Sequence, residues 1–297
     1  MYVSKRLAYL IPVLGISLGA CAGEGPDEPL VTTAPVPLEA TDGAFTFDSS
    51  ALRTRPAGQL PSRRLAMESY GDRAVRDRLI RTREDFTIKH TRGQRMFYES
   101  GSWVYEQDTS RGRVLALRKT AAGPATRLRA ADLQRQATAR LGSWGIGSGE
   151  VYRILQRKLM KTERPGNQVA RPEVFRHKTF VFRGLGGVRV EGSRAVVTHT
   201  LDGAINRVLI AWPPLASAGH LLRTNLSVAE MQRRAAAAMR KAGETRGKVT
   251  LRYKYVPAST DSGEIVLTLK VNARLARPAD DSPAEPREVE VDVSAVQ

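Results

Sequence analysis

The sequence has little from which to build a covalent or metal framework. One cysteine in 297 residues excludes an internal disulfide and any zinc or iron–sulfur site that needs several cysteine ligands. Aromatic residues make up only 6% of the chain, and no run of 20 apolar residues occurs. Together with 26% charged residues and a mean hydropathy of −0.32, this excludes a protein with several membrane-spanning helices. The hydrophobic fraction of 41% is still enough for the core of one large domain or two smaller ones.

Acidic residues are also few, and they are unevenly distributed. The chain has 47 Lys and Arg against 30 Asp and Glu, a net charge of +17. Only Lys5 and Arg6 are basic before Arg53, whereas six acidic residues lie there. The part from Arg53 onward therefore has 45 basic and 24 acidic residues, a net charge of +21. Most of the cations are arginine, which suits bidentate contacts with phosphate and carboxylate. Anionic lipid headgroups or cell-wall polymers are candidate ligands; alternatively, the arginines reflect genomic base composition and only solvate the surface.

The first 21 residues have the pattern of an export signal. Lys5 and Arg6 precede LAYLIPVLGISLGA, an apolar stretch that is too short to span a bilayer as a mature helix. Its last three residues and the next one are Leu18, Gly19, Ala20 and Cys21. This LGAC sequence resembles the lipobox of bacterial lipoproteins. The resemblance implies that Cys21 becomes the mature N-terminus and carries lipid, including palmitate, although an ordinary secretory signal with a coincidental cysteine is the alternative.

The lipobox also predicts a location. Residue 22 is alanine and not aspartate, so by analogy with Gram-negative sorting we expect the outer membrane. We assign residues 1–20 to the signal peptide and 21–62 to a lipid-anchored disordered tether. The tether is rich in Pro, Thr, Ala and Gly and shows no sustained helical or strand period. The protein is therefore expected in the cell envelope, held on the membrane through its lipid.

The remaining residues alternate between helical and strand patterns. We divide them into a helix plus a small β-meander (63–122), a helix plus an antiparallel sheet (123–218) and a second helix plus an antiparallel sheet (219–297). The expected fold class is α+β, with helices packed on curled antiparallel sheets. Helices are expected at 65–82, at 130–141 and directly after Ser227. Strands are expected at 151–160, 174–183, 188–192, 194–200, 205–212, 248–256, 264–275 and 288–296, with a loop at 276–287.

The clearest local signal lies at the start of the last helix. Ser227 and Glu230 have the spacing of a capping box, in which each side chain bonds the backbone N–H of the other residue. Leu226 and Met231 stand where a hydrophobic staple belongs, and Gly243 can end the helix in a left-handed conformation. The sequence therefore predicts a helix that begins at 228.

The segment 123–218 resembles domains of the PepSY and thermolysin-propeptide type. The residues that match that family's glycine and valine pattern are Gly187, Val188, Val190, Gly192, Val196, Val197, Asp202, Gly203, Ile205 and Val208. The resemblance implies a helix across an antiparallel sheet, possible twice in this chain, in a non-catalytic module that engages or restrains a peptidase or acts in envelope assembly. It supplies no catalytic residues, and no metallopeptidase zinc motif follows the segment.

The chain shows no catalytic constellation. Among four histidines, His177 and His199 lie on strands that could be neighbours, but a third ligand such as Glu173 or Glu191 would be needed for zinc. Polar faces of half-solvated strands explain both histidines better. Glycine-rich residues 184–187 precede a strand and no Walker lysine follows, so they are expected to form a tight turn. We therefore expect no catalytic residues, no metal and no cofactor.

The sequence thus predicts a lipid-anchored, non-catalytic envelope protein. Its basic body is expected to bind a protein, such as a peptidase, or an anionic envelope polymer; nucleic acid is not expected, because no recognition motif accompanies the charge. Two alternatives stay open. The first is a hydrolase that acts on peptidoglycan or peptides, and the second is a protein whose arginine face lies on anionic lipid.

Overall fold

The computed structural model describes most of the chain after residue 38. The described residues are 39–42, 44–52, 61–65, 72–119, 123–126, 128–161, 172–221, 226–259, 265–276 and 288–296. All of them belong to the compact unit Pro37–Gln297; the chain's other unit is Met1–Val36. The signal peptide, the lipobox, Cys21 and residues 277–287 of the expected loop lie outside the described residues.

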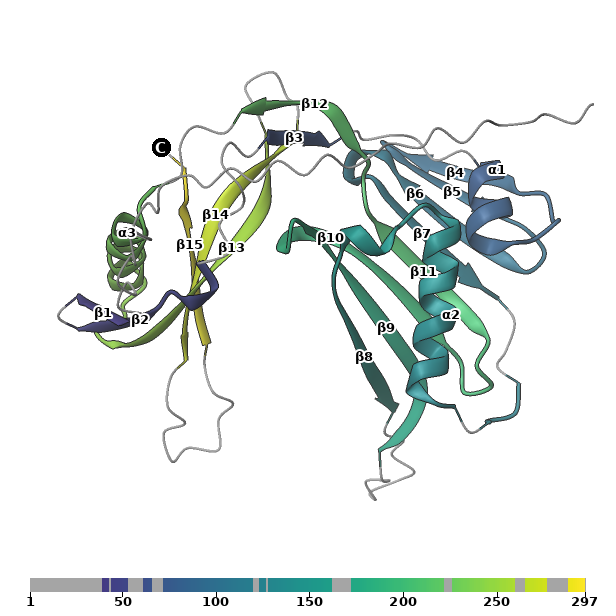
Figure 1. Ribbon diagram of the computed structural model, residues 1–297. Helices are drawn as coiled ribbons and strands as arrows, with labels where there is room; N and C mark the ends of the chain where they lie inside the picture. Colours follow the sequence, from purple (N-terminus) through teal and green to yellow (C-terminus); the bar gives the residue numbers. More distant parts are fainter. Residues whose placement is uncertain are drawn as a thin grey trace, which may run out of the picture. The chain divides into compact units, whose positions relative to one another are not determined.

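The structure is mostly β, so the expected α+β class is wrong. In the described residues, fifteen strands form one mixed sheet, and only three short α-helices accompany it (Figure 1). The helices are α1 (Asp72–Ala74), α2 (Ala130–Ser143) and α3 (Val228–Lys241). The two helix-plus-sheet units that we expected are not separate, because backbone pairing between their strands joins them in one sheet.

The strand order explains how the sheet is joined. The main path is β12-β3-β14-β13-β10-β11-β7-β6-β5-β4; β15 pairs with β14, β8 with β9, β9 with β10, and β2 with β1 and β13. The β10–β13 and β2–β13 pairs are parallel and the others are antiparallel. The strands are β1 (Glu39–Asp42), β2 (Phe45–Asp48), β3 (Pro61–Leu65), β4 (Thr87–Arg92), β5 (Arg95–Glu99), β6 (Trp103–Asp108), β7 (Arg113–Arg118), β8 (Val151–Lys161), β9 (Glu173–Leu185), β10 (Val188–His199), β11 (Ile205–Ala211), β12 (Leu215–Leu221), β13 (Gly247–Ser259), β14 (Ile265–Ala276) and β15 (Glu288–Ser294).

Strand β10 takes part in two hydrophobic cores. Val188 and Val190 lie in one cluster with apolar residues of α3, β13 and β14, whereas Ala195 and Val197 lie in a second cluster with residues of α2, β7 and β11. Between these two halves the pairing of β10 with β9 is interrupted, and Gly192 adopts a positive φ of 74°. Glycine enters this left-handed region without the steric cost that a Cβ brings. Arg189 pairs with Gly184 of β9 and also with Lys254 of β13, so β10 keeps β9 as one neighbour on both sides of the irregularity, while its other neighbour changes from β11 to β13.

The structure begins earlier in the chain than the expected tether allows. Phe45 and Phe47 of β2 are 1% exposed, and Leu52 is 2% exposed. All three belong to the cluster that contains α3, and β2 pairs in parallel with β13. These three apolar side chains, placed between acidic residues, supply the free energy of burial that orders this part of the segment.

Two of the three expected helices are confirmed. Helix α2 buries Leu133, Ala137 and Leu141, the four-residue spacing that predicted it. The helix expected over 65–82 is wrong in extent: 61–65 is strand β3, and α1 is followed at once by a π-helix, η2 (Val75–Ile80). The four-stranded meander β4–β7 and the turns at 184–187 and 201–204 are confirmed.

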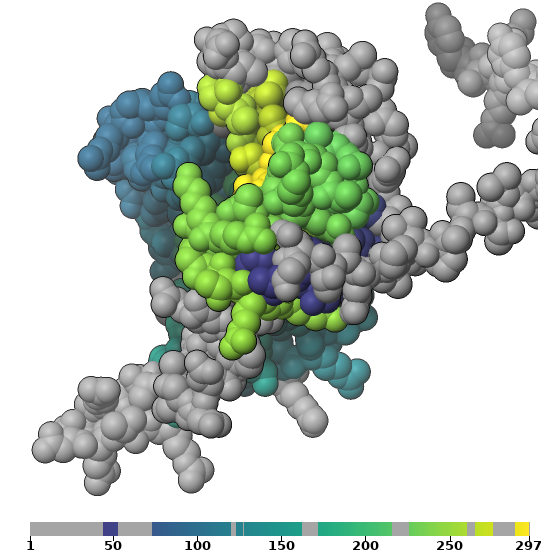
Figure 2. Space-filling view, turned by 90° about the vertical axis from the view of Figure 1, so that its left-hand side faces the viewer, coloured from purple at the N-terminus to yellow at the C-terminus, as the bar shows by residue number. Residues whose placement is uncertain are grey.

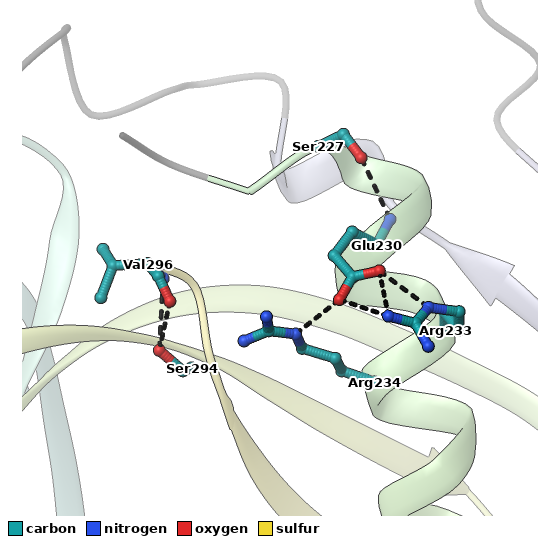
Figure 3. A network of polar contacts seen from close by, with 6 residues as sticks. All are labelled: Ser227, Glu230, Arg233, Arg234, Ser294 and Val296. Atoms are coloured by element: carbon teal, nitrogen blue, oxygen red, sulfur yellow. Dashed lines mark hydrogen bonds and ion pairs between the residues drawn. The ribbon is translucent and has the colours of Figure 1, made fainter. Parts of the chain in front are cut away.

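Helix α3 begins as expected, but its capping box is only half formed (Figure 3). Ser227 Oγ accepts a hydrogen bond of 3.2 Å from the backbone N–H of Glu230, as expected. The carboxylate of Glu230 instead binds the guanidinium groups of Arg233 and Arg234 at 2.7 Å. These ion pairs are stronger acceptor contacts than a return bond to the Ser227 N–H. Figure 2 shows α3, in green, at the surface beside the yellow residues of β15.

Residue positions along α3 agree with the sequence pattern. Met231, Ala235 and Met239 are buried in the cluster with β13 and β14, and Leu226 is buried there as well. Gly243 has a φ of +87° just beyond the helix end. No helix in the described part of the chain has the length and apolarity that a membrane span requires.

Candidate functional site

Alternation along β13 produces a polar sheet face. Val249, Leu251 and Tyr253 point into the core, so Thr250, Arg252 and Lys254 point to the opposite side. The register continues this polar face onto the next two strands, since Arg252 is opposite Asn272 and Asn272 is opposite Asp292. The sequence places polar and charged side chains at every second position of these strands, and the antiparallel register brings them together.

This polar face lines a groove of about 820 Å³. The other lining residues come from β8, β9 and β10, the first of which lies far from β13 in the sequence. We call the cavity the groove; the side chains that the argument uses are Arg153, Phe182, Arg189, Glu191, Arg252 and Lys254. Five basic residues line it, against the two acidic residues Glu191 and Glu290. The groove is therefore a site of positive potential.

Lys254 occupies a fixed position in the groove. Its side chain is 14% exposed and forms ion pairs with Glu191 of β10 and Asp292 of β15, the second at 2.6 Å. Burial alone would lower the pKa of the ammonium group, but hydrogen bonds from Lys254 to the two carboxylates outweigh burial and raise this pKa above its usual value. Lys254 is thus neutralised by protein carboxylates and ties β10, β13 and β15 together.

Three arginines of the groove are not neutralised in this way. Arg153, Arg189 and Arg252 form no ion pair or hydrogen bond with any described residue. The Arg189 guanidinium stacks over the ring of Phe182 at 5.0 Å, and Arg153 is opposite Phe182 in the β8–β9 register. Stacking holds a guanidinium without using its N–H donors. The groove therefore offers free donors in fork geometry beside an aromatic ring.

The two histidines singled out in the sequence are brought together by the fold. His177 of β9 is directly opposite His199 of β10, so the strands are neighbours as expected. His199 is fully buried, and neither ring nitrogen has a hydrogen-bond partner among the described residues. Burial, followed by the nearby His177, lowers the pKa of His199 to about 4. Within the described residues, no group of three or more His, Cys, Asp and Glu side chains is placed to hold a metal ion.

Sequence reasoning did not find the groove. The residues Arg153, Arg189 and Arg252 are 36 or more positions apart and meet only through strand pairing. A signal was present in β13, where Lys248, Thr250, Arg252 and Lys254 alternate with apolar residues. That pattern indicates one basic face, although it does not reveal which strand lies across from it.

No protein-family model matches the chain, and no curated protein matches it. Among solved structures, an uncharacterized protein from Eubacterium rectale is similar, with a TM-score of 0.51 and 9% sequence identity. The likeness covers 88% of this chain and 92% of that one. It is a likeness of fold. It assigns no activity to the groove.

Proposed function

We propose that this protein is a lipid-anchored, non-catalytic protein of the bacterial cell envelope whose basic β body binds an anionic envelope polymer in the groove. The observation that carries the proposal is a set of three groove arginines, Arg153, Arg189 and Arg252, that form no ion pair or hydrogen bond with any described residue. Guanidinium groups of this kind bind carboxylate and phosphate in bidentate geometry. A groove open along several strands suits a chain of repeating anionic units better than one small molecule.

The lipid anchor rests on the lipobox. Acylation at Cys21 would hold the protein on the membrane, and Ala22 favours the outer membrane of a Gram-negative cell. Cells that express the full chain should incorporate labelled palmitate into it and retain it in the membrane fraction. The Cys21→Ser variant should incorporate no label and should leave the membrane, whereas equal labelling of both would contradict the anchor.

Binding in the groove is tested with the full chain in detergent and polygalacturonate, a carboxylate polymer. We expect saturable binding that weakens steeply with salt, because several ion pairs form at once. Replacing both Arg153 and Arg252 with glutamine should raise Kd about tenfold or more, since each substitution removes a charge-assisted contact. Isothermal titration calorimetry at two salt concentrations measures both effects.

A matched control distinguishes binding in the groove from a general effect of the protein's net charge. Arg78 and Arg129 are exposed, line neither the groove nor the second cavity described below, and form no ion pair with a described residue. The Arg78→Gln/Arg129→Gln variant loses the same charge and should bind polygalacturonate nearly as well as the wild type. Equal weakening in both double variants would refute the groove as the site. Release of polymer fragments would favour the hydrolase, and preferential binding to anionic vesicles would favour the lipid-surface alternative.

A further inference from the structure

A second cavity, of about 420 Å³, lies at the end of the π-helix η2. It is lined by η2 and the residues after it, by α2, by the ends of β6 and β7, and by the turn before β11. None of its lining residues lines the groove. We call it the π-helix pocket; the side chains that the argument uses are Arg81, Glu84, Ser102, Arg118, Gln136 and Arg140.

Three arginines from three separate elements meet in the π-helix pocket. Arg81 directly follows η2, Arg118 ends β7, and Arg140 lies on α2. The side chains of Arg81 and Arg118 form no ion pair or hydrogen bond with any described residue. Arg140 Nη1 donates to the carbonyl oxygens of Leu79 at 2.9 Å and Ile80 at 3.3 Å. The guanidinium of Arg140 is therefore fixed, while the other two arginines keep all their donors.

The positive charges of the three arginines exceed the negative charge in the lining of the π-helix pocket. Burial, and the like charge of nearby Arg81, lower the pKa of Arg140. Glu84, the one acidic residue in the lining, offsets only one of the three positive charges; its Oε2 accepts from Ser100 Oγ at 2.6 Å and from the Ser102 N–H at 2.7 Å. These hydrogen bonds lower the pKa of Glu84 to about 2. A bound anion would reduce the electrostatic repulsion between the positive charges of Arg81 and Arg140.

The backbone at Arg81 gives an independent indication. Arg81 has φ 60° and ψ 50°, and in the described residues it is the one non-glycine residue with a positive φ. The position that follows a helix in this conformation favours glycine, because a Cβ is strained there. π-Helical turns frequently mark functional sites, and strain of this kind persists where a side chain is needed. The left-handed backbone at position 81 therefore makes arginine less favourable than glycine for the stability of the fold, while the arginine side chain is available to bind a ligand in the pocket.

We propose that the π-helix pocket binds a phosphate group, held by the guanidinium groups of Arg81, Arg118 and Arg140. Gln136 lines the same cavity and supplies an amide donor for a further oxygen. Phosphate is favoured because three guanidinium forks match a tetrahedral oxyanion with two charges. This site is separate from the groove and does not depend on the proposed polymer binding.

The test uses the full chain in detergent, inorganic phosphate as the probe, and the Arg81→Gly variant. In the absence of phosphate, the variant should melt about 2–4 °C higher than the wild type, since glycine relieves the left-handed strain. In titration calorimetry it should bind phosphate about tenfold more weakly. A lost side chain that only supported the fold would lower both the melting temperature and the affinity, so opposite shifts are the signature.

Two further variants complete the test. Arg118→Gln changes no strained backbone and should also weaken phosphate binding several-fold. The groove variant Arg153→Gln/Arg252→Gln should bind phosphate as the wild type does, even if polygalacturonate binding has failed altogether. The proposal is overturned if the wild type shows no saturable phosphate binding, if Arg81→Gly binds with unchanged affinity, or if binding is lost in the groove variant instead.

Discussion

Replacing Arg183 with methionine is expected to lower the free energy of unfolding by about 3 kcal/mol. Arg183 of β9 is 1% exposed, and its guanidinium is held on several sides. Nε and Nη2 donate to Glu150 Oε2 at 2.8 and 2.7 Å, and Nη1 donates to the Pro213 carbonyl at 2.6 Å. The group also stacks over Trp212 at 5.3 Å.

The cost arises because the partners of Arg183 are left without their donor. Methionine fills most of the volume of the arginine side chain. The decrease in the free energy of unfolding therefore comes from lost hydrogen bonds and charge more than from a cavity. Glu150 would keep one bond, from Trp212 Nε1 at 2.9 Å, and its side chain is 41% exposed, so water compensates it in part. Urea unfolding of the wild type and the variant measures the change.

A double-mutant cycle identifies the source of the loss. Glu150→Gln removes the charge and keeps an acceptor, and it should also destabilise the protein, because a buried guanidinium then lacks its counter-charge. The Arg183→Met/Glu150→Gln variant should lose at least 1 kcal/mol less than the two single losses together. Strict additivity, or a loss below 1 kcal/mol for Arg183→Met, would show that this pair is not coupled.

Local signals in the sequence predicted local structure well. The four-residue spacing in 130–141 and the Ser227 cap located α2 and α3, because a helix depends on residues three and four positions apart. Asp202-Gly203 predicted the turn before β11, where Gly203 has φ +84°. Each of these features is decided by fewer than twenty neighbouring residues.

Pairings between distant strands were not predictable in this way. The α+β class was wrong because the described residues are mostly strand and have only three short α-helices. The joining of the strands into one sheet was missed because β10 pairs in parallel with β13, more than fifty residues away. The groove depends on the same pairing, and Lys254 finds its partners, Glu191 and Asp292, on two different strands. The left-handed Arg81 was unpredictable for another reason, since sequence preference at that position favours glycine.

Acid should destabilise this protein through His199, and the His199→Leu variant should lose about 3 kcal/mol less stability between pH 7 and pH 4. The pKa of His199 is about 4 in the folded protein, below its usual 6.5. Burial favours the neutral ring. Between these two values the unfolded chain binds more protons than the folded one, so the free energy of unfolding falls as the pH falls.

The groups around His199 strengthen this effect. His177 is directly opposite on β9, and its own pKa is lowered by burial and by Lys158 on β8. Once His177 is protonated, its charge opposes a second charge on His199. On the other side, the cross-strand residue is the apolar Ile205 of β11, which cannot accept a proton or a hydrogen bond. No described residue gives the imidazolium a counter-charge.

Leucine also removes two ring nitrogens that form no hydrogen bond in the part of the chain that the structure describes. The His199→Leu variant should therefore be at least as stable as the wild type at pH 7. Urea unfolding at half-unit steps from pH 7 to pH 4 measures the free energy of unfolding of the wild type and of His199→Leu. The carboxylates titrate in both proteins, so their effect cancels in the difference between the two free energies. Parallel curves for wild type and His199→Leu would show that this buried ring is not the group that acid titrates.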